Sequence, residues 1–467
     1  MYRLLLLFSV VSLLLPRVAG CQSADSLLRK AMAANGHWET IRAFDYATHR
    51  TSYNRWQGYS FDCVQPEQDE YEVYVDLEHR RHWHHTLAHY AGGYVFNTVR
   101  INRDAGYYVY DLGLWRTGKA LLKVPGDLGE ANRRIILSSF PYFILKEMLD
   151  SGDSLQVQTS HSEIVVRRIT GTGTQELRFH PKTLLLASNK VITGSAVKEQ
   201  YFDAYTHVGA LYSLPGKMVQ KQNGEDVLSD QLVRFLPLAA ADTTRFSLPA
   251  GYTLQMDTTP PLRARAIAKD VYLVEKVDGD RNVLFINMDD QVLLTEAPVS
   301  GRVTRGIIEL IHRTLPGKPI GYVHLSHFHN DHIGGIGELV KEGAAVICTP
   351  SMEKPVREMT GGLAPEFSFF NGHKILEDAH HRIEFFEVPN SHAQGLSFLY
   401  LPAEKLIYEG DLLSMPEDAV VTPAFKVSQE FYEYIHQHNI AYKQIIGHHG
   451  LTIITPALFR QAIDAGR

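Results

Sequence analysis

Three histidines and an aspartate lie within six positions of one another, in residues 326–335. One residue separates His327 from His329, so their side chains can point the same way in an extended loop. Asp331 and His332 follow and can face a second position beside the first. Imidazole and carboxylate are ordinary zinc ligands, and two clusters this close predict a site for two metal ions. A histidine-rich surface loop is disfavoured, although the chain has 23 histidines, because four ligand-type residues share one turn.

The elements around this stretch are expected to hold it rigidly. Residues 320–325 form an apolar run that predicts a buried strand, and the glycine-rich residues 333–340 predict the start of a helix. Loops at strand ends often carry chemistry because the sheet fixes their position. Further ligand candidates also follow apolar runs that predict strands: His392, Asp411 and the adjacent pair His448 and His449.

The motif H-x-H-x-D-H, followed by a single histidine, a Gly-Asp pair and a Gly-His pair, resembles the signature of the metallo-β-lactamase superfamily of metal-dependent hydrolases. The resemblance implies seven metal ligands: His327, His329 and His392 for the first ion, Asp331, His332 and His448 for the second, and Asp411 as the bridge. His448 is preferred because it directly follows Gly447, and His449 remains an alternative. Glu296 stands where the family usually has an aspartate; it keeps the charge but is one methylene longer, which departs from the family pattern.

The same resemblance limits the classes of reaction that are expected. Diiron flavoproteins of this fold carry a glutamate at the position of His329, which disfavours their redox chemistry here. Asp411 is similar to the aspartate of thioesterases such as glyoxalase II and of lactonases, whereas zinc β-lactamases often use cysteine or serine. We therefore expect a dinuclear-zinc hydrolase in which a metal-bound hydroxide attacks an ester, thioester, lactone or amide carbonyl. Asp331 is the candidate catalytic residue that helps to manage the leaving group.

Two other functions stay open. Persulfide dioxygenases keep much of this ligand pattern but use a single Fe²⁺. A non-enzymatic alternative is an exported lipoprotein that carries an apolar ligand and has a vestigial metal site. The complete set of seven ligands speaks against the second alternative.

The N-terminus and the composition indicate an exported protein that acts on a small molecule. Arg3 precedes an apolar run over residues 4–15 that is too short to span a bilayer, which is typical of a signal peptide. The run ends in Val-Ala-Gly before Cys21, which resembles a bacterial lipobox. We expect a periplasmic or outer-membrane lipoprotein whose membrane attachment is a lipid on Cys21. The net charge of −6 disfavours nucleic acid as a partner.

The 467 residues suggest at least two domains, and 45% hydrophobic residues can bury sizeable cores. The predicted fold class is α+β: a mostly antiparallel β domain over residues 22–250, after a signal peptide over 1–21, and an αββα sandwich over 263–467. Turn formers over 251–262 predict a linker. The β domain resembles the half-open barrel of lipoprotein carriers in architecture alone. Its histidine-rich stretch, residues 79–85, is interpreted as a solvated sheet face, because interleaved arginines repel a metal ion.

Overall fold

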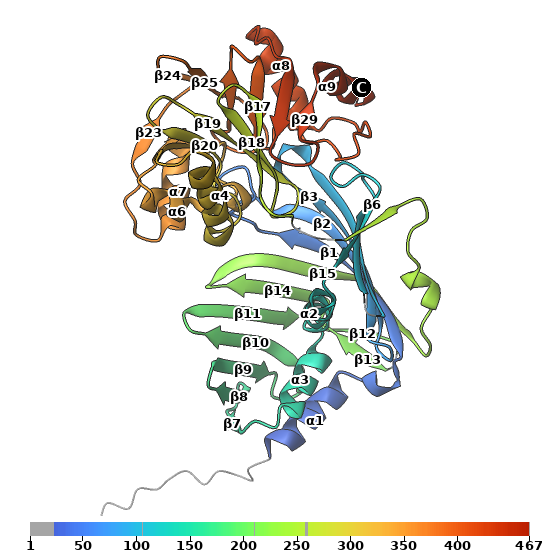
Figure 1. Cartoon of the computed structure of the whole chain (residues 1–467). Helices are drawn as coiled ribbons and strands as arrows, with labels where there is room; N and C mark the ends of the chain where they lie inside the picture. The colour runs from blue at the N-terminus through green and yellow to red at the C-terminus, as the bar shows by residue number, and fades with distance from the viewer. Residues whose placement is uncertain (1–22, 105, 210, 257–259, 467) are drawn as a thin grey trace, which may run out of the picture.

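The computed structural model describes residues 23–104, 106–209, 211–256 and 260–466. The predicted signal peptide and Cys21 lie outside these residues. Mixed α and β structure was expected and is confirmed, with a β-rich N-terminal domain followed by a layered α/β domain (Figure 1). Among the described residues, no helix has the length and the apolar character needed to cross a membrane.

One long, curved sheet dominates the N-terminal domain (Figure 1). Its strands, in spatial order, are β16 (Thr253–Met256), β6 (Ala120–Val124), β5 (Gly106–Asp111), β4 (Val95–Arg103), β3 (Arg81–His89), β2 (Glu67–Asp76), β1 (Ala43–Ser52), β15 (Glu225–Leu238), β14 (Lys217–Gln222), β11 (Ala196–Asp203), β10 (Leu186–Thr193), β9 (Gly173–Phe179), β8 (Ile164–Thr170) and β7 (Leu155–Thr159). Neighbouring strands are antiparallel except for β16, which runs parallel to β6 and occupies part of the expected linker. A separate hairpin pairs β12 (Thr206–Val208) with β13 (Tyr212–Leu214).

Three helices pack on this sheet: α1 (Ala24–Ala34), α2 (Gly126–Leu137) and α3 (Pro141–Asp150). Pro141 occupies the first turn of α3 and separates this helix from α2, because proline is tolerated in a first turn but not in a helix interior. Apolar side chains of α1 and α3 form one core with strands β8–β11. The N-terminal domain also has three short 3₁₀ helices, η1 (Trp38–Thr40), η2 (Ala91–Gly93) and η3 (Thr243–Phe246), among its described residues. A fourth, η4 (Pro350–Met352), lies in the C-terminal domain.

The histidine-rich strand β3 does not present a solvated face at His82 and His84, so that expectation was wrong for these residues. Both side chains are buried and their rings stack with centroids 6.0 Å apart. The covering element is α2, whose Gly129 packs closely against Tyr107 and Asn102. Burial lowers the pKa of His82 to about 4, so the ring is neutral at pH 7.

The C-terminal domain is a sandwich of two sheets covered by helices on both sides (Figure 1). The first sheet contains, in spatial order, β17 (Ala264–Ala268), β18 (Val271–Val277), β19 (Arg281–Asn287), β20 (Val292–Thr295), β21 (Ile320–His324), β22 (Ala345–Cys348) and β23 (Phe367–Phe369). The second contains β24 (His373–Glu377), β25 (Arg382–Glu387), β26 (Ser397–Leu401), β27 (Leu406–Glu409), β28 (Gln444–Gly447) and β29 (Ile453–Ile454). The helices are α4 (Gly301–Thr314), α5 (Asn330–Ile333), α6 (Ile336–Lys341), α7 (Glu353–Thr360), α8 (Lys426–Gln437) and α9 (Pro456–Ala465).

Apolar residues from both sheets, such as Leu273, Leu284, Phe385 and Leu399, form the layer between them. Ser300 caps the N-terminus of helix α4, since its Oγ accepts from the N–H of Val303, and the apolar stripe of the helix is buried. The apolar runs of the sequence are thus buried, each one covered by a sheet or a helix.

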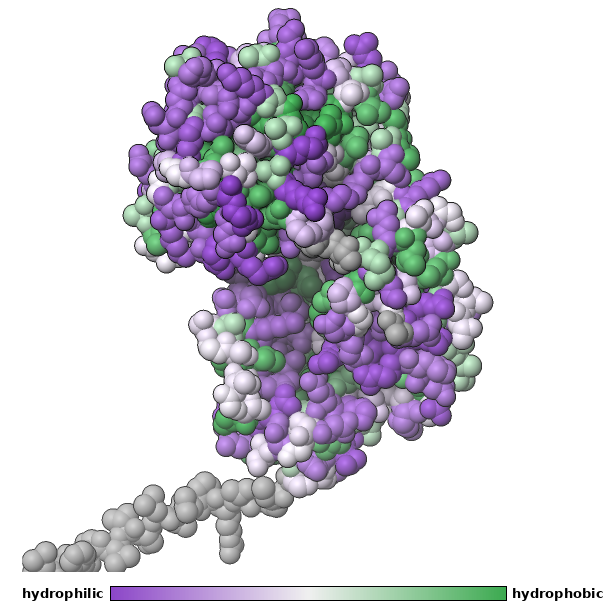
Figure 2. Space-filling view, in the orientation of Figure 1, coloured by the Kyte–Doolittle hydropathy of each residue, from purple (hydrophilic) through white to green (hydrophobic). Residues whose placement is uncertain are grey.

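The two domains are not separate in their packing. Phe61, Tyr94 and Trp115 of the N-terminal domain belong to the same buried apolar cluster as Phe328 and Leu413 of the sandwich. Phe61 meets Phe328 edge-on, with ring centroids 5.8 Å apart. In the space-filling view, the surface is hollowed below the C-terminal domain where it meets the N-terminal sheet (Figure 2).

Candidate metal centre

The histidine motif lies where strand β21 ends. His327 and His329 occupy the loop after this strand, and the short helix α5 carries Asp331 and His332. The imidazoles of all three histidines are fully buried. A rigid strand and the first turn of a helix therefore fix the four side chains, as the sequence predicted.

The remaining candidates come from the second sheet. His392 lies in the loop after β25, Asp411 follows β27, and His448 directly follows β28. Glycine is required before Asp411, because a Cβ on Gly410 would lie 2.3 Å from Ser326 Oγ. Asp411 itself has a φ of +63°, an uncommon conformation for a residue with a side chain. The turn thus strains the backbone in order to place this carboxylate.

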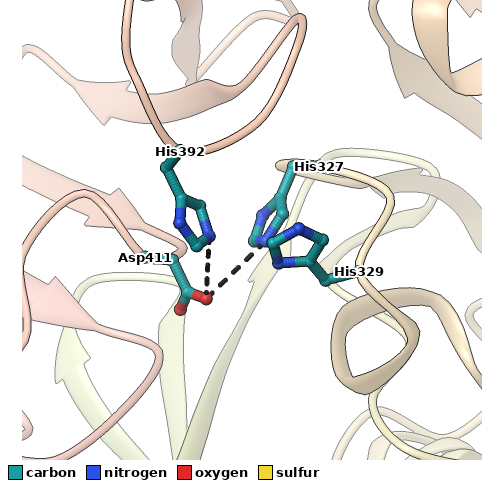
Figure 3. A group of neighbouring side chains, drawn as sticks. All are labelled: His327, His329, His392 and Asp411. Atoms are coloured by element: carbon teal, nitrogen blue, oxygen red, sulfur yellow. Dashed lines mark ion pairs between the residues drawn. The ribbon is translucent and has the colours of Figure 1, made fainter. Parts of the chain in front are cut away.

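A first group of ligand-type side chains comprises His327, His329, His392 and Asp411, whose candidate ligand atoms lie within 4.8 Å of one another (Figure 3). Asp411 Oδ2 lies 3.3 Å from His392 Nε2 and 3.6 Å from His327 Nε2. These are the four residues assigned from the sequence to the first ion and the bridge.

A second group comprises His332, His448 and His449. The other oxygen of Asp411, Oδ1, lies 3.3 Å from His332 Nε2 and 3.5 Å from His449 Nε2. One carboxylate therefore faces two histidine groups, one with each oxygen. The structure places both histidines of the Gly-His-His sequence at the centre, so the choice between them stays a prediction.

Asp331 lies beside the second group rather than within it. Its Oδ2 is 3.3 Å from His449 Nε2 and 3.6 Å from Arg281 Nη2. Its Oδ1 accepts a hydrogen bond from Gln57 Nε2 at 2.7 Å. This carboxylate is therefore held by three partners, one of which belongs to the N-terminal domain.

Four of the buried motif histidines use one ring nitrogen for orientation. The contacts are Ser326 Oγ to His327 Nδ1 at 2.9 Å, His329 Nε2 to the carbonyl of Gly58 at 3.0 Å, His392 Nδ1 to the carbonyl of Ala91 at 2.9 Å, and His448 Nδ1 to Tyr408 Oη and the carbonyl of Asn282, both at 2.9 Å. The opposite nitrogens are buried without a hydrogen-bond partner: His327 Nε2, His329 Nδ1, His392 Nε2 and His448 Nε2. Buried polar atoms are normally paired, so these nitrogens fit the donor set of a metal site.

The electrostatics also fit metal binding. Burial holds the pKa of His327 and His448 well below the ordinary value and lowers that of His329 to about 3. These imidazoles are neutral at pH 7, which is the state that binds a metal. Burial opposes the charge on Asp411, but His332 and His449 outweigh it and hold the pKa of this carboxyl well below its usual range. Asp411 is consequently an anion.

Two buried glutamates contact the segments that carry the ligand-type side chains. Glu296 is fully buried, and its Oε1 lies 3.4 Å from His332 Nδ1. Its Oε2 accepts from the N–H of Ser326, so the longer side chain reaches the motif loop. Glu409 Oε2 accepts from the N–H groups of Leu412 and Leu413 and so fixes the turn that carries Asp411. Burial raises the pKa of Glu409 to about 8.

A pocket of about 300 Å³ opens onto these residues. Asp331, His392, Asp411 and His449 face it from the sandwich. The opposite wall comes from the N-terminal domain, whose lining residues are Gln57, Tyr90, Tyr94, Phe96, Trp115 and Arg116. Sequence reasoning missed this wall, because its residues are scattered over loops and strands and form no motif.

Part of the chain is similar to known proteins. Residues 277–448 match the model of the metallo-beta-lactamase superfamily. Among solved structures, a metallo-beta-lactamase from Pontibacter korlensis is 17% identical, with a TM-score of 0.37, and the match covers 44% of this chain and 98% of the other. The DIM-1 metallo-beta-lactamase is 20% identical, with a TM-score of 0.35 and coverage of 45% and 98%. The flavodiiron protein of Giardia intestinalis is 16% identical, with a TM-score of 0.34 and coverage of 44% and 59%.

Proposed function

We propose that this protein is a metal-dependent hydrolase that binds two zinc ions per chain and cleaves an ester, thioester, lactone or amide. The observation that carries the proposal is the position of Asp411. Its two oxygens lie 3.3 Å from His392 Nε2 and 3.3 Å from His332 Nε2, in two different histidine groups. A carboxylate between two sets of imidazole nitrogens is suited to bridge two cations.

When bound, the ions activate water and polarise the scissile carbonyl. The residues of this chain then have distinct tasks. His327, His329 and His392 would hold the first ion; His332, with His448 and Asp331, would hold the second; and Asp411 would contact both. Asp331 also lies at the pocket, so it can accept or return a proton at the leaving group.

The aromatic wall of the N-terminal domain supports a closed reaction site. Tyr94 donates from Oη to the carbonyl of Asp411 at 3.0 Å, and its ring meets the imidazole of His392 edge-on. Trp115 and Phe96 pack edge to face beside it. Apolar walls exclude water and strengthen the electrostatic interactions inside the pocket. The substrate therefore enters between the domains and contacts both.

Metal analysis combined with a substrate panel tests this function. The purified protein should contain about two zinc ions per chain and hydrolyse members of a panel of aryl esters, thioesters, lactones and β-lactams. Asp411→Asn should lower the affinity for both ions by at least about a hundredfold and abolish hydrolysis. Asp290→Asn, at an exposed carboxylate far from these groups, is the matched control. One iron per chain and no hydrolysis would instead favour a persulfide dioxygenase.

We also propose that the protein is exported and attached to a membrane through a lipid on Cys21. The support is the sequence of the N-terminus, in which an apolar run ends in Val-Ala-Gly before this cysteine. Periplasmic exposure fits an enzyme that acts on a small molecule outside the cytoplasm.

A further inference from the structure

A second cavity adjoins the pocket at the metal centre. Its volume is about 540 Å³, larger than the first. The two cavities share lining residues from both domains, namely Tyr90, Phe96, Arg116, Asp280 and Arg281. A molecule with its reactive group at the metal centre can thus extend past these residues into the second cavity.

The inner face of the N-terminal sheet forms the wall of this second cavity. Strand β4 lines it with Phe96, Thr98 and Arg100, which alternate with the buried residues Val99 and Ile101 on the other face. Strand β6 lines it in the same alternating manner with Ala120, Leu122 and Val124. Hydroxyl groups and a guanidinium interrupt the apolar surface. A purely apolar ligand would leave these polar groups without partners, which costs binding energy.

Arg100 differs from the other cations along this cavity. Lys276 pairs with Glu417 at 2.9 Å, and Arg116 pairs with Asp280 at 3.3 Å. Arg281 lies 3.5 Å from Asp280 and 3.6 Å from Asp331. Within the described part of the chain, Arg100 has no carboxylate oxygen within 4.0 Å, and its side-chain hydrogen bond goes to His84. Its positive charge is therefore available to a ligand.

A histidine holds this guanidinium in place without neutralising it. Arg100 Nη1 lies 3.2 Å from His84 Nε2. Arginine can only donate, so His84 accepts at Nε2 and is neutral. Burial and the charge of Arg100 hold the pKa of His84 well below its ordinary value, which agrees with that assignment. The remaining N–H groups of Arg100 form a preoriented fork for an oxyanion.

We propose that the second cavity binds the non-reacting end of the substrate, and that this end carries an oxyanion, a carboxylate or a phosphate, recognised by Arg100. The substrate class is thus an extended acyl compound with its scissile carbonyl at the metal centre and an anionic group at the far end. This inference rests on the proposed hydrolase function. It assigns substrate selection to the N-terminal domain, outside the part of the chain that matches the superfamily model.

The test uses 4-nitrophenyl monoesters of dicarboxylic acids with four to twelve carbons, each compared with the neutral ester of the same length. The full-length, metal-loaded protein should have a lower KM for the anionic ester once the chain is long enough to reach Arg100. Arg100→Met should raise that KM by about tenfold to a hundredfold, with kcat and the neutral ester unaffected. Esters that end in a phosphonate distinguish phosphate from carboxylate as the preferred oxyanion.

Two further variants control for folding and for general charge. Arg100→Lys keeps the charge and should recover part of the selectivity. Lys123→Met removes a cation from β6 on the opposite face to Leu122 and Val124, and should leave both KM values unchanged. Equal melting temperatures would show that Arg100→Met is folded.

A binding measurement separates this inference from the proposed function. Titration calorimetry compares the binding of octanedioate with that of octanoate. Both can place one carboxylate at the metal centre, but only octanedioate has a second carboxylate for Arg100. Octanedioate should bind more tightly to the wild type but not to Arg100→Met. If no ester is hydrolysed but this difference is found, the hydrolase function fails and the oxyanion site stands. If esters are hydrolysed and Arg100→Met changes neither KM nor binding at any chain length, the oxyanion site is refuted.

Discussion

Gly92 packs against His392 so closely that a Cβ built on the glycine would lie 3.0 Å from the Cβ and 3.1 Å from the Nδ1 of the histidine. Gly92 has a φ of +85°, and its N–H donates to the carbonyl of Ser391. The preceding residue, Ala91, accepts from His392 Nδ1. A turn of the N-terminal domain thus fixes the orientation of a histidine that faces the metal centre from the C-terminal domain.

Gly92→Ala should displace His392 and weaken the first metal position. Metal analysis should then give about one ion per chain instead of about two. Gly93→Ala is a matched control, because Gly93 has a similar φ of +80° but faces Lys426 rather than the centre. The control should keep the wild-type metal content. Equal loss of metal in both variants would mean that backbone strain, and not the contact with His392, is responsible.

Gln57→Leu should weaken the second metal position. This side chain donates to Asp331 Oδ1 at 2.7 Å and to Asn330 Oδ1 at 2.8 Å. Loss of such a supporting hydrogen bond lowers metal affinity by about 10-fold to 100-fold. Competition with a chelator measures this affinity. Ser60→Ala removes a hydrogen bond from the same loop to Gln394 instead, and should have no effect on metal binding.

Substitution of each adjacent histidine determines which of them is the ligand. His448 Nε2 is buried and has no hydrogen-bond partner, whereas His449 Nε2 lies near Asp331 and Asp411. We expect His448→Ala to empty the second position and His449→Ala to retain about two ions with reduced activity. The reverse pattern of metal content would assign the ligand role to His449.

The pH dependence of stability should report on His82. Burial lowers its pKa from 6.5 to about 4 in the folded protein. Between these values the unfolded chain binds a proton that the folded chain does not, so stability is retained above pH 6.5 and lost as the pH falls toward 4. The full difference corresponds to about 3 kcal/mol. His82→Leu should reduce the drop in melting temperature between pH 7.5 and pH 5, whereas His161→Gln, at an exposed histidine, should not.

Membrane attachment should depend on Cys21. Cys21→Ser removes the lipidation site of the proposed lipobox and should move the protein from the membrane fraction to the soluble fraction of its host. The enzyme itself should keep its metal content. Sedimentation followed by immunoblotting measures the distribution, and continued membrane association would show that another feature is the anchor.

The sequence by itself determined the sandwich and the inventory of its site. Most strands of the sandwich contain a short apolar run, and the histidine and aspartate motifs follow such runs. His327, His329 and His332 are close in sequence, so local geometry alone brings them together. The order of the later motifs allowed His392 and Asp411 to be added through the family resemblance. The break at Pro141 was also predictable, because proline acts on its own backbone.

Only the tertiary structure decided what surrounds that site. Gly58 and Ala91 act through backbone carbonyls, which any residue possesses, so no residue type marks them. Their partners lie 271 and 301 positions away in the chain, where local patterns carry no information. The alternation of β3 predicted that His82 and His84 share a face, but which face is buried depends on where α2 packs. The alternation of residues in a strand is the same whichever of its two faces is buried, so only long-range packing decides which face that is.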